Sequence, residues 1–252
     1  MRCRGSTPEF FFGILALKSN FGINLRAEKD FRRTNMGEAE LLKHNNQLII
    51  HAVIIIYGDA ANDEIAKFIA ADIAHFWNDA KGKVNIKNQM FEVRFNIEGI
   101  WDKQLIPQRV YENTNPQNNY FRIEEYASGN ISFVDGINSN TGYFKLDNLL
   151  NKSTTAAHEF GHTIGLDHPK DLDIRGKGTP GIMYPRGTIV DAIYQYDSNA
   201  KPNAAGGTIN PFTRRVLQSD IDNLRLHKLD FDANGFAIVG GFTSMWHDKH
   251  LP

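Results

Sequence analysis

The chain has 252 residues, of which 41% are hydrophobic, so it is long enough to bury one substantial core. Its 28 basic and 29 acidic residues leave a formal net charge of -1, which argues against a nucleic-acid or membrane-surface partner. The single cysteine, Cys3, excludes an intramolecular disulfide, and no apolar stretch approaches the length of a membrane-spanning helix. Composition therefore predicts one folded domain with appendages, stabilised by packing or by a bound metal.

The first 45 residues are predicted to be an N-terminal arm, a linker or a tag. A short apolar run at residues 10–17 follows two arginines, as in a signal peptide, but Glu9 interrupts the basic flank and no clear small-residue cleavage site follows before Lys18. A cloning scar, or the end of a longer polypeptide from which the domain was cut, would explain the same residues. Residues 18–43 are rich in charge and Asn without periodicity, which is typical of a linker or a mobile arm.

Residues 48–57 form the predicted central strand. Their sequence, LIIHAVIIIY, is a nearly continuous apolar run, typical of a strand covered on both faces, and Gly58 closes it. Asn62 is then placed to cap a helix whose apolar residues recur every three or four positions, as far as the break at Lys81 and Gly82. This helix is expected to back the sheet.

Four further strands are predicted after this helix. Residues 91–97 alternate apolar and polar side chains, the period-two pattern of a strand with one solvated face. Three short candidates follow at residues 120–126, 131–134 and 142–146, separated by segments rich in Gly and Asn. The sequence therefore predicts a five-stranded, mixed, twisted sheet with one backing helix.

The stretch HEFGHTIGLDH, which ends at His168, concentrates the metal-binding chemistry of the chain. Because consecutive helical residues are 100° apart, His158 and His162 lie on one helix face and can bind the same ion, with Glu159 beside them. Gly165 permits the left-handed backbone that ends a helix, so the chain can turn there and bring His168 up as a third ligand. Three imidazoles leave a fourth position for water, as in a catalytic rather than a structural zinc site.

The pattern HExxHxxGxxH resembles the metzincin clan of zinc endopeptidases, and HEFGHTIGLDHP is similar to its matrixin and serralysin branches. The later run GIMYP, which contains Met183, resembles the Met-turn of that clan. The resemblance implies a zincin-like α+β fold with a zinc-site helix, and one zinc ion bound by the three histidines. It also implies that Glu159 is the general base and that Met183 forms an apolar floor beneath the histidines. Pro185 occupies the position of the extra tyrosine ligand of astacins and serralysins, so no such ligand is expected.

A smaller C-terminal subdomain is predicted after the Met-turn. Residues 186–211 are rich in Gly, Asn, Ala and Pro and are expected to form a long loop, which in the relatives walls the pocket for the residue after the scissile bond. Ser219 is predicted to cap a closing helix with Asp220 and Asp222 in its first turn, and VLQSDIDNLRL is similar to the closing helix of matrixins and serralysins. Residues 230–252 are expected to be a C-terminal tail.

Two oxygen-rich segments could bind calcium. The sequence DFDANG from Asp230 opens like a calcium loop, but Gly241 stands where the bidentate Glu belongs, so a turn is favoured. Residues 135–140 could bind calcium through side chains and carbonyls, or could form an ordinary hairpin connection. The predicted cofactor is therefore Zn²⁺, one ion per chain, and Ca²⁺ is left open.

Taken together, these patterns predict a monomeric, secreted or extracellular zinc endopeptidase with its catalytic domain over residues 46–229. Its substrates are expected to be proteins or peptides, bound along the edge strand at residues 131–134 or else at 142–146. The alternatives are a catalytically silent metal-binding interaction domain, a toxin module of a larger polypeptide, and a zinc hydrolase that does not act on peptides. Glu159 and the Met-turn favour the peptidase over a silent domain.

Overall fold

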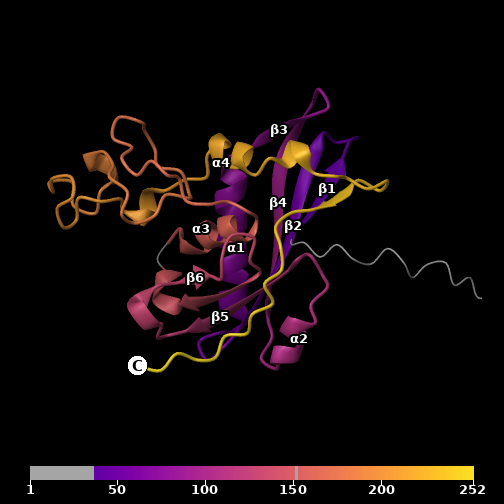
Figure 1. Ribbon diagram of the computed structural model, residues 1–252, viewed down its shortest axis with the longest axis horizontal. Helices are drawn as coiled ribbons and strands as arrows, with labels where there is room; N and C mark the ends of the chain where they lie inside the picture. Colours follow the sequence, from indigo (N-terminus) through magenta and orange to yellow (C-terminus); the bar gives the residue numbers. More distant parts are fainter. Residues whose placement is uncertain (1–36, 151–152) are drawn as a thin grey trace, which may run out of the picture. The chain divides into compact units, whose positions relative to one another are not determined.

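The computed structural model describes residues 37–150 and 153–252 (Figure 1). The predictions for Cys3 and for the apolar run at residues 10–17 lie outside these ranges. Within them the chain forms one sheet and several helices, so the predicted mixed α+β fold is confirmed. Across the same residues, no helix combines the length and the hydropathy that crossing a membrane requires.

The elements follow one another along the chain in the order of their numbers. The strands are β1 (Glu38–Leu42), β2 (Gln47–Tyr57), β3 (Lys83–Ile86), β4 (Gln89–Trp101), β5 (Asn118–Glu124), β6 (Phe133–Val134), β7 (Thr141–Lys145) and β8 (Phe236–Ile238). The α-helices are α1 (Asp63–Asp79), α2 (Pro107–Tyr111), α3 (Thr155–Thr163) and α4 (Gln218–Asn223). Short 3₁₀ helices lie at Ser128–Asn130, Leu146–Asn148, Ala192–Tyr194, Pro211–Thr213 and Leu226–Lys228.

Strand β2 is the centre of the sheet, as predicted. β4 pairs with it in parallel along one edge, while the other edge is shared by β1, antiparallel at residues 47–51, and β5, parallel at residues 53–57. The main path of the sheet is β3-β4-β2-β5-β7-β6, and β8 joins through β1. Burial of consecutive side chains, the mark of a strand covered on both faces, is confined to the last four residues of β2; earlier residues alternate between buried and half-buried.

All five predicted strands are present, but the described residues contain eight strands, and two come from outside the predicted domain. β1 lies in the segment expected to be an arm, and β8 lies in the segment expected to be a tail; the two pair with each other. Each has at most five residues, too few for a period-two pattern to stand out. Strand β3 was not predicted either. Its turn to β4 is formed by Lys87 and Asn88, both at positive φ, whereas the sequence pattern that usually marks such a hairpin turn is Asn-Gly. The sheet therefore includes residues on both sides of the predicted catalytic domain, 46–229.

Helix α1 backs the sheet and connects it to α3, the helix that carries His158 and His162. Its predicted cap is confirmed, because Asn62 Oδ1 accepts a hydrogen bond from the Ile65 amide at 2.9 Å. The helix lies so close to β4 that a methyl group at Gly99 would overlap with the Ala66 carbonyl. At the far end, the Trp77 indole donates a hydrogen bond to the Ala157 carbonyl of α3 at 3.1 Å. Core packing around α1 therefore sets the position of α3.

Asp72, on α1, is a polar group that weakens this packing. Burial raises the pKa of its carboxyl from 3.8 to about 6, and its Oδ2 has no hydrogen-bond partner in the described part of the chain. Replacing Asp72 with Asn is expected to stabilise the fold by about 1 kcal/mol at pH 7, after allowance for solvent screening. Because the folded pKa is the higher one, the gain should be absent below about pH 4 and should grow as pH rises through 6. Urea unfolding at pH 4 and pH 7 would measure it, with the exposed Asp79→Asn as control; an equal gain at both pH values would contradict this explanation.

The segment after α3 contains few regular elements. Residues 169–216 project beside the sheet as irregular loops, drawn in orange in Figure 1, as predicted for residues 186–211. The closing helix α4 follows, but it begins at Gln218, and its N-cap is Leu217 rather than the predicted Ser219. The carboxylate of Asp220 accepts a hydrogen bond from the Leu217 amide at 2.8 Å, so an acidic side chain inside the helix satisfies the first amide.

The C-terminal segment packs on the sheet instead of forming a free tail. It runs in extended form past β5, drawn in yellow in Figure 1. The rings of Trp246 and Tyr57 stack with their centres 4.5 Å apart, and those of His250 and Tyr143 stack at 3.9 Å. Aromatic stacking of this kind was invisible in the sequence, because it joins residues more than a hundred positions apart.

Candidate metal centre

Helix α3 carries two of the predicted ligands and ends where the chain must turn to supply the third. Gly165 has φ +105°, the Leu166 amide donates to the Gly161 carbonyl at 2.9 Å, and the Gly165 amide donates to the His162 carbonyl at 3.1 Å. These two bonds form a Schellman motif, which reverses the chain at the end of a helix. A side chain at Gly165 would be strained and would also meet Asn138 Oδ1 at 2.8 Å. The reversal places His168 opposite the helix.

The three imidazoles converge on one point. His168 Nε2 lies 3.1 Å from His158 Nε2 and 3.1 Å from His162 Nε2. Among residues 37–150 and 153–252, these three side chains form the one group whose potential metal-binding atoms lie close enough together to bind the same ion. A tetrahedral ion with metal–nitrogen distances of 2.0 to 2.1 Å requires nitrogens about 3.3 Å apart. The spacing of the side chains therefore fits a zinc ion.

Backbone carbonyls orient two of these imidazoles. His158 Nδ1 donates to the Ile182 carbonyl and His162 Nδ1 donates to the Leu166 carbonyl, both at 2.7 Å. A ring whose Nδ1 carries the proton has a lone pair on Nε2, so both rings direct a lone pair at the common point. His168 Nε2 can donate a proton to only one of them, whereas a cation satisfies all three.

The electrostatic environment keeps the three rings neutral, as metal binding requires. Burial is the largest cause in each case and lowers the pKa of His158, His162 and His168 below the ordinary value. The positive charge of Arg214 acts in the same direction on all three.

Glu159 is a buried carboxyl beside the ligands, with 8% of its surface exposed. Its Oε2 accepts a hydrogen bond from the Val134 amide of β6 at 3.2 Å, so the last strand along the path of the sheet holds it in place. Burial raises the pKa of Glu159 to about 8, against the opposing effects of the Val134 bond and of Arg214. A carboxyl with a raised pKa is suited to exchanging protons near neutral pH.

Met183 lies directly against α3, at the position between the two helical ligands. It is 2% exposed, and a methyl group at Gly161 would overlap with its sulfur. The same turn supplies the Ile182 carbonyl that orients His158. The turn around Met183 therefore packs against α3 at Gly161 and fixes the orientation of the His158 imidazole.

Replacing Gly161 with Ala is expected to push Met183 away from α3 and to destabilise the fold by about 1 to 3 kcal/mol. Because the displaced turn also carries the Ile182 carbonyl, zinc affinity should fall by about 10- to 100-fold. Thermal unfolding and a competitive zinc titration would measure the two effects. Gly187→Ala is the matched control, since a methyl group there meets nothing within 4 Å; unchanged zinc affinity in Gly161→Ala would refute this role of the turn.

Arg214 is a buried cation at the centre that the sequence did not reveal. Only 4% of it is exposed; Nη1 donates to the Tyr184 carbonyl and Nε donates to Thr154 Oγ1, both at 2.9 Å. Nη1 also lies 3.0 Å from His158 Nδ1, and because that nitrogen donates to Ile182, the two groups face each other as donors. Burial lowers the pKa of Arg214 to about 10, so the guanidinium stays charged at neutral pH.

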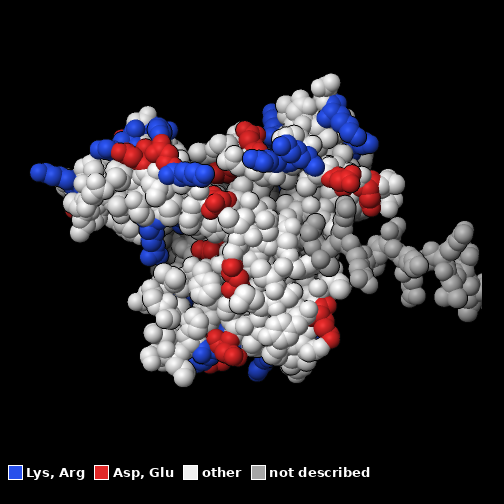
Figure 2. Space-filling model, in the orientation of Figure 1, with Lys and Arg blue, Asp and Glu red and all other residues white. Residues whose placement is uncertain are grey.

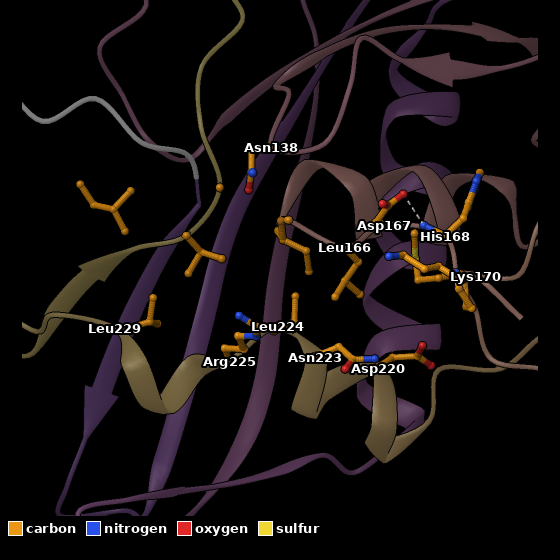
Figure 3. Close-up of a pocket in the computed structure, with 17 residues that line it drawn as sticks. Asn138, Leu166, Asp167, His168, Lys170, Asp220, Asn223, Leu224, Arg225 and Leu229 are labelled. Carbon is orange, nitrogen blue, oxygen red and sulfur yellow. Dashed lines mark hydrogen bonds between the residues drawn. The ribbon is translucent and has the colours of Figure 1, made fainter.

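Two hollows adjoin the centre. The larger, about 650 Å³, lies between the segment that carries His168 and helix α4 (Figure 3). In this hollow Asp167 Oδ1 accepts a hydrogen bond from the His168 amide at 2.7 Å, which positions the third ligand. The smaller, about 170 Å³, is lined by His158, Glu159 and His168 together. The smaller cavity is therefore the one that opens onto the candidate catalytic groups.

No protein-family model matches this sequence, and no curated protein matches it. Among solved structures, one described as "Structure of myroilysin" aligns with 71% of this chain and 94% of its own, at 13% sequence identity and a TM-score of 0.35. A similarity at this TM-score establishes neither the fold nor the function of this chain. Inference about function therefore depends on the chain's own residues.

The structure brings the predicted ligands and Glu159 together, but it gives the two candidate calcium segments other roles. Asp232 Oδ1 accepts hydrogen bonds from the Asn234 and Phe236 amides, which forms the turn that precedes β8. Asp135 Oδ2 is bonded to the Thr141 hydroxyl and to His247 Nε2. Both carboxylates are thus engaged within the protein.

Proposed function

We propose that this chain is a zinc-dependent endopeptidase of the metzincin clan. His158, His162 and His168 hold one zinc ion, and Glu159 is the general base. The observation that carries the proposal is the convergence of three Nε2 atoms at a cavity that Glu159 also lines. The matching spacing in the sequence, HExxHxxGxxH followed by a Met-turn, supports it independently.

Each group at the site has a separate role in the proposed reaction. When bound, zinc supplies Lewis-acid polarisation of the scissile carbonyl and makes water a stronger acid. Glu159 accepts a proton from the attacking water and returns it to the leaving amine. Because the Val134 amide holds Oε2, Oε1 is the oxygen that receives the proton. Met183 and the carbonyls bonded to the imidazoles keep the ligands in place.

The proposed substrate is an extended peptide beside β6. β6 lies at the end of the sheet path, and β7 pairs with β5 on one side and β6 on the other. The pairing of Gly142 and Tyr143 with β6 favours β6 over the alternative binding edge at residues 142–146, and the strand itself is shorter than the predicted 131–134. A peptide added along β6 would pass Glu159, because Val134 contacts it.

Peptide cleavage by the purified, zinc-loaded protein tests the proposal. Fragments of a proteome-derived peptide library would be sequenced before and after chelation, and after zinc is restored. The proposal expects internal cleavages that disappear with the chelator and return with zinc. Bound zinc without any cleavage would favour a silent metal-binding domain, and turnover of small esters alone would favour a hydrolase of another class. Secretion, a monomeric state and origin as a toxin module remain proposals outside this test.

A further inference from the structure

The small cavity beside the metal centre has a basic wall. Besides the ligands and Glu159 it is lined by Arg214 and Arg186, and Glu159 is its one acidic residue. Figure 2 shows basic side chains at the recess between the loops of residues 169–216 and the region of β6. The cavity volume of about 170 Å³ is below the roughly 300 to 1,000 Å³ of sites for whole small-molecule ligands, so it suits a single side chain.

Arg214 is held in one position and makes no direct ion pair in the described part of the chain. Its Nε and Nη1 are fixed by neutral oxygens of Thr154 and Tyr184, and Glu159 acts on it across the cavity without a direct ion pair among the described residues. These bonds do not use Nη2, which is therefore the nitrogen left for a ligand in the cavity. Buried charges in proteins are normally paired, because an unpaired one loses hydration without compensation.

Arg186 adds a second charge at the same cavity. It is exposed, and the described residues offer it neither an ion pair nor a side-chain hydrogen bond. Burial is the largest cause that lowers the pKa of Arg214, Glu159 opposes it, and the charge of Arg186 lowers this pKa further, so the two guanidinium groups repel each other. An anion between them would relieve that repulsion, whereas an apolar side chain would increase the desolvation of both.

We propose that Arg214 and Arg186 bind a substrate carboxylate, so that the enzyme cleaves next to an acidic group. This specificity rests on the proposed peptidase function. A hydrogen bond from Nη2 of Arg214 or from the Arg186 guanidinium to a carboxylate is charge-assisted, which is the stronger class of hydrogen bond. The carboxylate can come from an Asp or Glu side chain near the scissile bond, or from the C-terminus of a short peptide.

Matched peptides separate these sources. Zinc-loaded enzyme would be given peptide pairs that differ only as Asp against Asn, or Glu against Gln, on either side of the cleaved bond, each with a free and an amidated C-terminus. The proposal expects kcat/KM to be about tenfold or more higher for the acidic member of a pair, or for the free C-terminus. Equal rates for all members, with cleavage still dependent on zinc, would overturn this specificity and leave the peptidase function standing.

Substitution of each arginine tests whether these side chains cause the preference for acidic peptides. Arg214→Gln is expected to abolish the acidic preference, measured as the ratio of kcat/KM between the two members of each peptide pair. Arg186→Gln should reduce the preference by about threefold or more without affecting the fold, since its side chain is exposed. The control is Arg215→Gln, whose guanidinium bonds to the carbonyls of Phe212 and Arg214 and does not line the cavity.

If Arg214→Gln does not fold, the preference of Arg186→Gln for acidic peptides still tests the proposal. A preference that survives Arg186→Gln unchanged, or that falls equally in Arg215→Gln, would contradict the assignment. No cleavage of any peptide by zinc-loaded protein would overturn both this specificity and the peptidase function.

Discussion

Replacing Glu159 with Gln is expected to lower kcat/KM for peptide cleavage by about 10²- to 10⁴-fold, with one zinc ion still bound per chain. The amide oxygen of Gln can still accept the hydrogen bond from Val134, so the geometry is retained, but the group can no longer accept a proton. Zinc should stay because the three imidazoles, not this side chain, surround the metal position.

The comparison needs metal analysis and peptide kinetics on the same preparations. Glu125→Gln is the control, because Glu125 is exposed and lies outside the cavity, and it should behave like the unmodified protein. Undiminished cleavage in Glu159→Gln would show that another group, or no protein group, takes the proton from water.

Replacing His168 with Ala is expected to lower zinc affinity by at least about 100-fold and to abolish cleavage at ordinary zinc concentrations. The two remaining imidazoles come from one helix and leave half of a tetrahedral site unfilled. The fold itself should persist, because His168 lies on the turn after α3 and is exposed.

Competitive zinc titration and far-ultraviolet circular dichroism would separate metal loss from unfolding. His227→Ala provides the control, since His227 is exposed and remote from the three ligands. Zinc affinity that is unchanged in His168→Ala would mean that another residue supplies the third ligand.

Local sequence signals were enough for the elements that carry the ligands. The apolar run of β2, the Asn62 cap of α1 and the turn at Gly165 are each encoded within about ten residues, and the structure has all three. The histidine spacing works for the same reason, because a helix followed by a left-handed glycine largely determines where the next few side chains point.

Features that depend on contacts between distant segments could not be predicted. β1 pairs with β8 although about 200 residues separate them, and no local pattern signals that pairing. Gly161 is required because Met183 packs against it, and Arg214 matters because its loop folds back onto α3. A lone glycine inside a helix and an arginine in a loop are ordinary in sequence, so only the folded chain reveals their roles.

The most direct test of the central claim is a zinc titration of the metal-free protein with peptide cleavage as the readout. If three histidines hold one catalytic ion, the cleavage rate should rise in proportion to added zinc and saturate at one ion per chain. The same titration of Glu159→Gln should bind one ion while the rate stays near the baseline. Cleavage by the metal-free protein, or saturation only at two ions per chain, would contradict the account.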